Sequence, residues 1–286
     1  QYYRYKKWLN YRNKVTDFIM DSIADIGDIK SCTLIGVGNS DDIDLKRLSP
    51  KVRRLTLSDI DLDAMKDAVK KYDLEQAQFK LVEIDYLGIS ENEFWNNFVN
   101  RCIELDHQAL FMEISKFHQS IKNSAFYNDL LVDNDLIIVS PIYTQLIFQQ
   151  LLANLKVLEN INFPPQTIEE IRSVFLGFLP TLINDFNDNL INLIHPDGRL
   201  IVFSDILEFN TTDEDWKTIS GKVADSNFID DYLDKYRSKY GYGLGDYGLE
   251  NLAERMIIYR HIWLIWPFDN NRVILVKACS LSKKKL

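Results

Sequence analysis

The stretch from Ser31 to Asp59 constrains the fold more than any other part of the sequence. An apolar run ends in a turn that contains Gly36 and Gly38, and a second apolar run ends in Asp59. Glycine has no Cβ and tolerates positive φ, so a ligand can approach the backbone closely at the end of the first run. An acid about 20 residues later, at the end of the next strand, is placed to bind the two hydroxyls of a ribose. The stretch therefore predicts half of an α/β fold that binds a nucleoside.

The composition fits a cytoplasmic globular protein. The 286 residues are 46% hydrophobic, which is enough for one α/β domain, or two small ones, with a large core. No apolar run approaches the ~18 residues of a membrane span. The first residues are polar and aromatic, unlike a signal peptide. The cysteines, Cys32, Cys102 and Cys279, lie far apart and form no CxxC pair, so we expect buried free thiols.

The net charge of −9 favours a small molecule or a peptide over a nucleic acid as the partner. The first fourteen residues are an exception, because basic and aromatic side chains alternate there, as in proteins that bind single-stranded nucleic acids. However, Trp8, Tyr11, Val15 and Phe18 recur at helical spacing. The pattern favours an amphipathic helix with a solvated basic face over a nucleic-acid site.

Strand and helix signals alternate along most of the chain. The predicted strands cover residues 32–37, 54–58, 79–84, 136–139, 199–203, 261–266 and 272–278. The predicted helices cover residues 5–25, 62–72, 91–123, 143–159 and 167–193. The short link over residues 267–271 predicts an antiparallel hairpin, whereas the earlier strands are joined through helices.

Two segments interrupt this alternation. The Pro164-Pro165 pair precedes a helical segment, so we expect a helical insertion at about residues 160–195 that forms a specificity wall. A polar, aromatic stretch at about residues 205–260 contains Gly241, Gly243 and Gly245, and it is either a lid or a plain surface loop. We thus expect an N-terminal helical extension over residues 1–28 and a Rossmann-like domain over residues 29–286.

Between about residues 31 and 280 the chain resembles the class I S-adenosylmethionine-dependent methyltransferases. Four places carry the resemblance: the turn Gly36-Val37-Gly38-Asn39-Ser40, which is similar to GxGxG; Asp59 with Ile60 after the second strand; Asp85 with Tyr86 after the third; and Ser140-Pro141-Ile142-Tyr143 after the fourth. The resemblance implies an α/β fold with a doubly wound, mostly parallel seven-stranded sheet, an antiparallel C-terminal hairpin strand and a three-layer αβα sandwich. Leu34 and Ser40 depart from the pattern, in place of an acid and of the third glycine.

The resemblance also implies a reaction and a site. The enzyme would transfer the methyl group of S-adenosylmethionine in line to a small-molecule or peptide acceptor, leaving S-adenosylhomocysteine. Asp59 would hold the ribose and Asp85 the adenine amino group. The implied cofactor-binding residues are Gly36, Val37, Gly38, Asn39, Ser40, Asp59, Ile60, Asp85, Tyr86 and Ser140. Tyr143 and Ser140 would lie nearest the methyl group as the catalytic pair.

Other hypotheses remain open. Asp41, Asp42 and Asp44 would repel the diphosphate of a dinucleotide, so methyl transfer is preferred over hydride transfer. Enzymes that methylate amino groups of nucleic-acid bases carry Asn/Asp/Ser-Pro-Pro-Tyr where this chain has Ser140 to Tyr143, with Ile142 departing from the pattern. The departures at Leu34 and Ser40 motivate a third hypothesis, a scaffold without catalysis.

At some of these positions an ordinary structural role is the alternative to a functional one. Aspartates at strand ends commonly cap the following helix, which is the alternative for Asp59 and Asp85. His195 fits the turn before the fifth strand, and a structural role is favoured for it. The remaining histidines show no ligand spacing, so no metal site is proposed.

Overall fold

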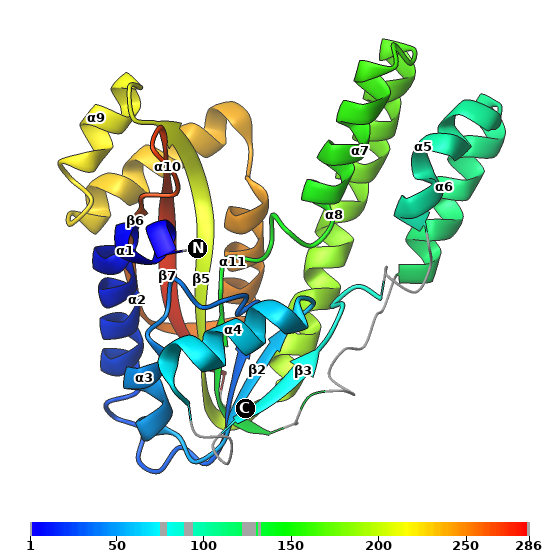
Figure 1. Ribbon diagram of the computed structural model, residues 1–286. Coiled ribbons are helices and arrows are strands. Elements are labelled where there is room, and N and C mark those ends of the chain that lie inside the picture. The colour runs from blue at the N-terminus through cyan, green and yellow to red at the C-terminus, as the bar shows by residue number, and fades with distance from the viewer. Residues whose placement is uncertain (1, 75–78, 89–93, 122–129, 131–132, 285–286) are drawn as a thin grey trace.

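The computed structural model describes residues 2–74, 79–88, 94–121, 130 and 133–284. Figure 1 shows a twisted central sheet with helices on both faces. The sheet has seven strands in the order β3-β2-β1-β4-β5-β7-β6. The strands are β1 (Cys32–Ile35), β2 (Leu55–Asp59), β3 (Phe79–Glu83), β4 (Asn134–Val139), β5 (Ile194–Asn210), β6 (Met256–Trp266) and β7 (Arg272–Lys283).

Strands β1 to β5 are mutually parallel, and β7 runs antiparallel to both of its neighbours, β5 and β6. The predicted fold class is therefore confirmed, including the closing hairpin. Strand β5 continues to Asn210, seven residues beyond the predicted end at Phe203, because its second half pairs with β7 alone. A register shift between Asp205 and Leu207 marks the place where that extension begins.

Helices occupy most of the remaining described residues. They are α1 (Tyr2–Lys7), α2 (Leu9–Ser22), α3 (Leu45–Leu48), the 3-10 helix η1 (Ser49–Lys51), α4 (Leu62–Tyr72), α5 (Phe94–Glu104), α6 (His107–Ile121), α7 (Phe148–Asn160), α8 (Pro165–Leu193), α9 (Glu214–Ser220), α10 (Ser226–Tyr240) and α11 (Leu244–Arg255). Within the described part of the chain, no helix is long and apolar enough to cross a membrane.

Alternation along the strands divides the core between the two faces of the sheet. Leu34 faces the cluster that contains α2, α3 and α4, whereas its neighbour Ile35 faces the cluster of α5, α7, α8 and α11. Both side chains are fully buried, as expected for a strand inside a parallel sheet covered on both faces. The three cysteines are free and buried, as predicted.

Three predicted helices have different limits in the structure. The helix predicted over residues 5–25 is divided into α1 and α2 and ends at Ser22. The helix predicted over residues 91–123 is divided into α5 and α6, because the Asp106 carboxylate accepts a hydrogen bond from the Ala109 N–H at 2.8 Å and so caps a new helix. Both ends of that predicted range lie outside the described residues. Helix α7 begins at Phe148, and Tyr143 lies in the turn before it.

The N-terminal helices pack against the sheet through the predicted apolar stripe, since Trp8, Tyr11 and Phe18 are buried. The expected solvated basic face is wrong at Arg12, which is 2% exposed. The Arg12 guanidinium donates at 2.9 Å to the carbonyl oxygens of Tyr5 and Asp41. A buried cation needs such acceptors, and here they connect α2 to the glycine turn.

Candidate functional site

Two adjoining cavities open at the carboxyl ends of β1, β2 and β4, where β2 and β4 flank β1 and the strand order reverses. In open α/β sheets this switch point is where ligands bind. The small cavity has a volume of about 130 Å³ and the large cavity about 640 Å³. Both are lined by Gly36, Asp59, Pro141 and Gln145, so the two cavities meet at the glycine turn.

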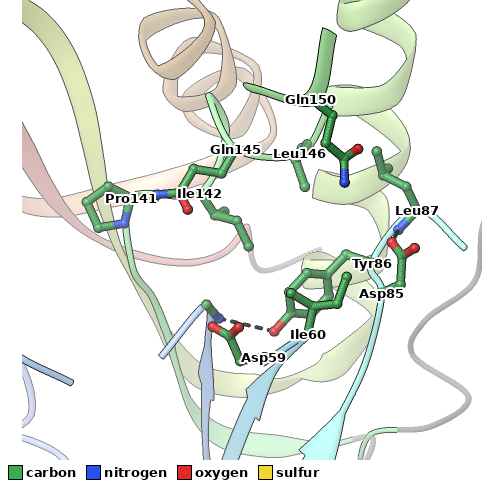
Figure 2. Close-up of a pocket in the computed structure, with 11 residues that line it drawn as sticks. Asp59, Ile60, Asp85, Tyr86, Leu87, Pro141, Ile142, Gln145, Leu146 and Gln150 are labelled. Carbon is green, nitrogen blue, oxygen red and sulfur yellow. Dashed lines mark hydrogen bonds between the residues drawn. The ribbon is translucent and has the colours of Figure 1, made fainter. Parts of the chain in front are cut away.

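The small cavity lies between two sets of side chains, as Figure 2 shows. One set follows β2 and β3, and it comprises Asp59, Ile60, Asp85, Tyr86 and Leu87. The other set lies in the segment between β4 and α7 and in the first turn of α7, and it comprises Pro141, Ile142, Gln145, Leu146 and Gln150. The lining thus mixes apolar side chains with carboxylate, hydroxyl and amide groups, a combination that suits a flat heterocycle with polar edges.

Asp59 occupies the junction of the two cavities. Its Oδ2 accepts a hydrogen bond from the Gly38 N–H at 2.7 Å, and its Oδ1 accepts one from the Asp61 N–H at 3.0 Å. A carboxylate offers about four acceptor positions, so these two bonds leave capacity for two hydroxyl groups. The side chain thus joins the ends of β1 and β2 and still faces the cavities.

Tyr86 joins the end of β1 to the end of β3. Its hydroxyl accepts the Gly36 N–H at 3.1 Å and lies 2.9 Å from the Ser58 Oγ. Burial raises the pKa of Tyr86 above its usual range, so the hydroxyl stays neutral. Asp85 caps its own turn, because its Oδ1 accepts the Leu87 N–H at 3.0 Å. Both residues line the small cavity, and both also bind backbone N–H groups of the segments that surround it.

The glycine turn needs left-handed backbone conformations at three positions. Gly36 has a φ of +72°, and a Cβ there would lie 3.1 Å from Ile142 Cδ1 at the cavity wall. Gly38 has a φ of +48°. Ser40 also adopts a positive φ, 51°, and its Oγ donates to the Ile43 carbonyl at 2.9 Å. The serine therefore follows the path that the third glycine of the motif would take.

Some predicted cofactor-binding residues shape this turn without reaching the cavities. The side chains of Val37 and Ser40 are buried, and neither residue lines either cavity. Gly38 and Asn39 line the large cavity. The structure thus brings together all the predicted residues around the turn, but two of them, Val37 and Ser40, support the turn from inside the core.

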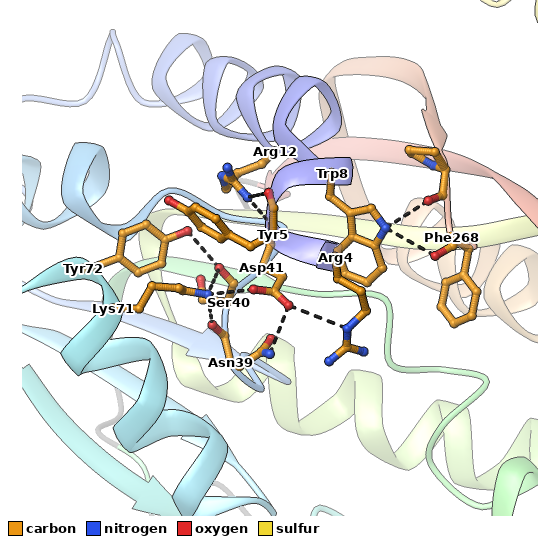
Figure 3. A network of polar contacts seen from close by, with 11 residues as sticks. Arg4, Tyr5, Trp8, Arg12, Asn39, Ser40, Asp41, Lys71, Tyr72 and Phe268 are labelled. Atoms are coloured by element: carbon orange, nitrogen blue, oxygen red, sulfur yellow. Dashed lines mark hydrogen bonds and ion pairs between the residues drawn. The ribbon is translucent and has the colours of Figure 1, made fainter. Parts of the chain in front are cut away.

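A polar network holds the far side of the turn (Figure 3). The Lys71 ammonium donates to the Ser40 carbonyl at 3.2 Å and to Asp41 Oδ1 at 2.8 Å. The Tyr72 hydroxyl donates to the same Ser40 carbonyl at 2.9 Å. Asp41 is 3% exposed, and Arg4 on α1 adds a second ion pair at 3.9 Å. Its charge is therefore balanced by cations from two helices.

The large cavity is acidic and aromatic. Its carboxylates are those of Asp41, Asp42, Asp59, Asp61, Asp205 and Glu208, and its aromatic side chains are those of Trp8, Trp266 and Phe268. Thr144 Oγ1 donates to Asp205 Oδ2 at 2.6 Å. Burial raises the pKa of both Asp42 and Asp205 to about 6. Asp44, the third acid after the turn, instead caps α3 by accepting the N–H groups of Lys46 and Arg47.

Tyr143 does not lie where we expected it. Its side chain is fully buried and lines neither cavity. The hydroxyl donates to Asn187 Oδ1 on α8 at 2.8 Å, and a Cβ on Gly248 of α11 would lie 2.6 Å from the ring. The turn before α7 directs Tyr143 into the core between α8 and α11, and this corrects its assignment beside the methyl group. Ser140 does line the large cavity.

No family model and no curated protein matches the sequence. Among solved structures, the N-methyltransferase NodS from Bradyrhizobium japonicum in complex with S-adenosyl-L-homocysteine is 13% identical, with 96% of this chain and 87% of that chain covered and a TM-score of 0.46. TehB from Haemophilus influenzae is 9% identical, with coverage of 94% and 62% and a TM-score of 0.45. A putative RNA methyltransferase from Pyrococcus horikoshii is 9% identical, with coverage of 94% and 81% and a TM-score of 0.38.

The chain has a Rossmann-like α/β fold with a doubly wound, mostly parallel seven-stranded sheet. This assignment rests on the strand order of the chain itself, in which β7 alone is reversed and lies between β5 and β6. The low sequence identities and TM-scores of the compared structures carry nothing further about activity or ligand.

Most residues of the other predicted segments lie outside the cavities. In the segment expected at about residues 205–260, Asp205 and Glu208 on β5 line the large cavity, whereas residues 211–255, all of which the structure describes, form α9, α10, α11 and their connections and line neither cavity. The helical insertion corresponds to α8, whose 29 residues also contribute nothing to either lining. His195 accepts the Asp197 N–H on its Nδ1 at 3.1 Å, at the amino end of β5 and away from the site.

Sequence reasoning missed the residues that line the cavities after Ile142. Gln145, Leu146 and Gln150 fall in an apparently continuous helix, where periodicity alone does not mark a cavity wall. Asp205 had a usable signal, because it follows the apolar run of the fifth strand as Asp59 and Asp85 follow the second and third. Trp266 had none, since it is the last residue of an apolar strand pattern.

Proposed function

We propose that the protein is an S-adenosylmethionine-dependent methyltransferase that acts on a small-molecule or peptide acceptor. The observation that carries this proposal is the pair of adjoining cavities that meet at Asp59 and the glycine turn. The small cavity combines apolar side chains with polar groups, as an adenine site requires, and the large cavity has room for a second reactant.

The residues present fit the cofactor. Gly36 leaves open the space that a Cβ would take beside Ile142, which allows close approach to the backbone. Asp59 has acceptor capacity for the ribose hydroxyls, and Ile60 and Ile142 offer apolar faces for the adenine. Asp85 is the acceptor assigned to the adenine amino group. The cofactor, when bound, supplies an electrophilic methyl group on a sulfonium.

The protein's own contribution is alignment and exclusion of water. In-line displacement requires the acceptor to be held on the axis of the bond that breaks, and such positioning can account for much of the rate gain. Ser140 and Pro141 stand at the end of β4, where the large cavity meets the turn. The indole of Trp8 lines the same cavity, and its Nε1 donates to the Pro267 carbonyl at 2.9 Å. The N-terminal helices thereby cover one side of the acceptor space.

The burial of Tyr143 supports a small-molecule or peptide acceptor over a nucleic-acid base. In base amino methyltransferases the aromatic residue at this place stacks on the flipped base. A ring packed between α8 and α11 has no face available for stacking. The net charge of −9 likewise offers no general attraction for a phosphate backbone.

Calorimetric titration with S-adenosylhomocysteine tests the proposed function. We expect binding in the micromolar range and at least a tenfold loss of affinity in Asp59→Ala. Asp63→Ala is the matched control, because Asp63 lies in the first turn of α4, is exposed and lines neither cavity. The absence of heat with the unaltered protein would reject methyl transfer and support the scaffold hypothesis.

A further inference from the structure

We propose that the large cavity binds a positively charged acceptor, an organic ammonium held by Asp205 and Asp42 against the Trp266 wall. This inference rests on the proposed function and specifies its substrate class. It is carried by the balance of charges in the cavity and by buried polar atoms there that lack partners among the described residues.

Most carboxylates that line the cavity already have partners. Asp41 is paired with Lys71 and Arg4, and Asp59 accepts two backbone N–H groups. Asp61 caps α4 by accepting the Ala64 N–H at 2.9 Å, and Glu208 lies 3.5 Å from Arg272. These four acids are therefore accounted for by the fold itself.

Asp205 and Asp42 are the acids left over. Neither forms an ion pair with any residue that the structure describes. Asp205 Oδ1 is buried and has no hydrogen-bond partner among those residues, although Oδ2 is bound to Thr144. A buried carboxylate oxygen without a partner is costly, and a ligand cation that reaches it would remove the cost.

The cations that line the cavity cannot fill this role. Arg4 reaches Asp41 and lies over the Trp8 ring at 5.6 Å. Arg272 is bound to Asp269 and lies over the Phe268 ring at 4.7 Å. Both guanidinium groups are thus engaged at the aromatic rim, and neither forms an ion pair with Asp205 or Asp42. Arg12 and Lys71 act on Asp42 only from beyond ion-pair distance, so a ligand cation in the cavity would supply the close partner that both acids lack.

Two further buried side chains that line the cavity lack hydrogen-bond partners. Ser140 is 5% exposed and Trp266 is 7% exposed, both line the cavity, and neither Ser140 Oγ nor Trp266 Nε1 has a hydrogen-bond partner in the described structure. Tyr11 stacks on the back of Trp266, with ring centroids 5.5 Å apart. An indole fixed in this way presents an apolar and electron-rich wall that suits an organic cation better than a hydrated metal ion.

Paired amines and alcohols of the same shape test the inference. The probes are n-butylamine and phenethylamine, each compared with 1-butanol or 2-phenylethanol by calorimetry, both with and without saturating S-adenosylhomocysteine. We expect at least one amine to bind tenfold more tightly than its alcohol. Asp205→Asn and Asp42→Asn should each reduce that preference below threefold, whereas Asp231→Asn, at an exposed position on α10, should leave it unchanged.

The possible failures separate clearly. If neither amine binds more tightly than its alcohol, or if Asp205→Asn preserves the preference, the inference is rejected while the proposed function stands. If Asp205→Asn weakens binding of S-adenosylhomocysteine itself tenfold, the carboxylate serves the cofactor, and the inference is rejected as well. If the unaltered protein does not bind S-adenosylhomocysteine, the proposed function is rejected. This holds even if the protein prefers amines to alcohols in the titrations that contain no S-adenosylhomocysteine.

Discussion

Replacement of Asp205 by asparagine should stabilise the folded protein at pH 7.5 and lose this effect at pH 4. Burial raises the pKa of Asp205 from its ordinary value of 3.8 to about 6, and the charge of Glu208 adds to the shift. Between these two values the folded state binds more protons than the unfolded state, so stability falls as the pH rises through this window. Above pH 6 the full penalty of the buried charge is present.

The size of the effect follows from the pKa shift. A difference of about 2 units at 1.36 kcal/mol each gives a penalty of about 3 kcal/mol at neutral pH. Asparagine carries no charge and can keep the hydrogen bond from Thr144, but its amide hydrogens meet no acceptor, which costs about 1–2 kcal/mol. The net expectation is a gain of about 1–2 kcal/mol at pH 7.5.

Urea unfolding followed by tryptophan fluorescence at pH 4, 5, 6 and 7.5 measures this difference. Asp231→Asn removes an exposed carboxylate and should change the free energy of unfolding by no more than about 0.5 kcal/mol. A gain that is equal at all four pH values would refute the reasoning, since it would not depend on ionisation. A loss confined to neutral pH would show that a cation of the protein stabilises the carboxylate.

Substitutions at three other positions, Lys71, Ser40 and Tyr143, test the remaining parts of the site by urea unfolding and S-adenosylhomocysteine titration. Lys71→Met should destabilise the protein by about 3 kcal/mol, because it leaves the buried Asp41 with Arg4, at 3.9 Å, as its ion-pair partner. Lys66→Met on the same helix is the control and should cost under about 0.5 kcal/mol. Ser40→Gly should change stability by less than about 1 kcal/mol and preserve binding, while Ser40→Val, which is β-branched at positive φ, should cost more than about 2 kcal/mol. Tyr143→Phe should cost about 1–2 kcal/mol through its lost hydrogen bond, with unchanged affinity; a tenfold loss of affinity at full stability would return Tyr143 to the site.

The proposed acceptor class and the stability prediction concern the same carboxylate. A group that destabilises the folded protein when ionised is retained for a reason other than folding, and sites of function are where such groups concentrate. Asp205 combines this property with a place in the large cavity, whereas Asp41, which is more deeply buried, is neutralised by the protein itself. The contrast separates a carboxylate that holds the glycine turn from one that is available to a ligand.

The sequence by itself determined the strands of the sheet and the residues at the strand ends beside the small cavity. Short apolar runs separated by helical periodicity identify parallel strands because such strands are buried on both faces, and all seven predicted strands are present. The sequence also placed Asp59 and Asp85 at the edge where the small cavity lies, because the carboxyl ends of parallel strands meet at one edge of the sheet. Their roles toward a cofactor stay predictions.

Only the tertiary structure decided which side chains after β4 line the cavities and which acids are neutralised. Tyr143 and Ile142 are neighbours in sequence, but one turn sends the first into the core and the second into the cavity wall. Asp41 and Asp42 are also neighbours, yet Lys71, thirty positions away, pairs only with the first. Side-chain direction in a turn and the partners of a charge depend on contacts between distant segments, and local patterns do not encode them.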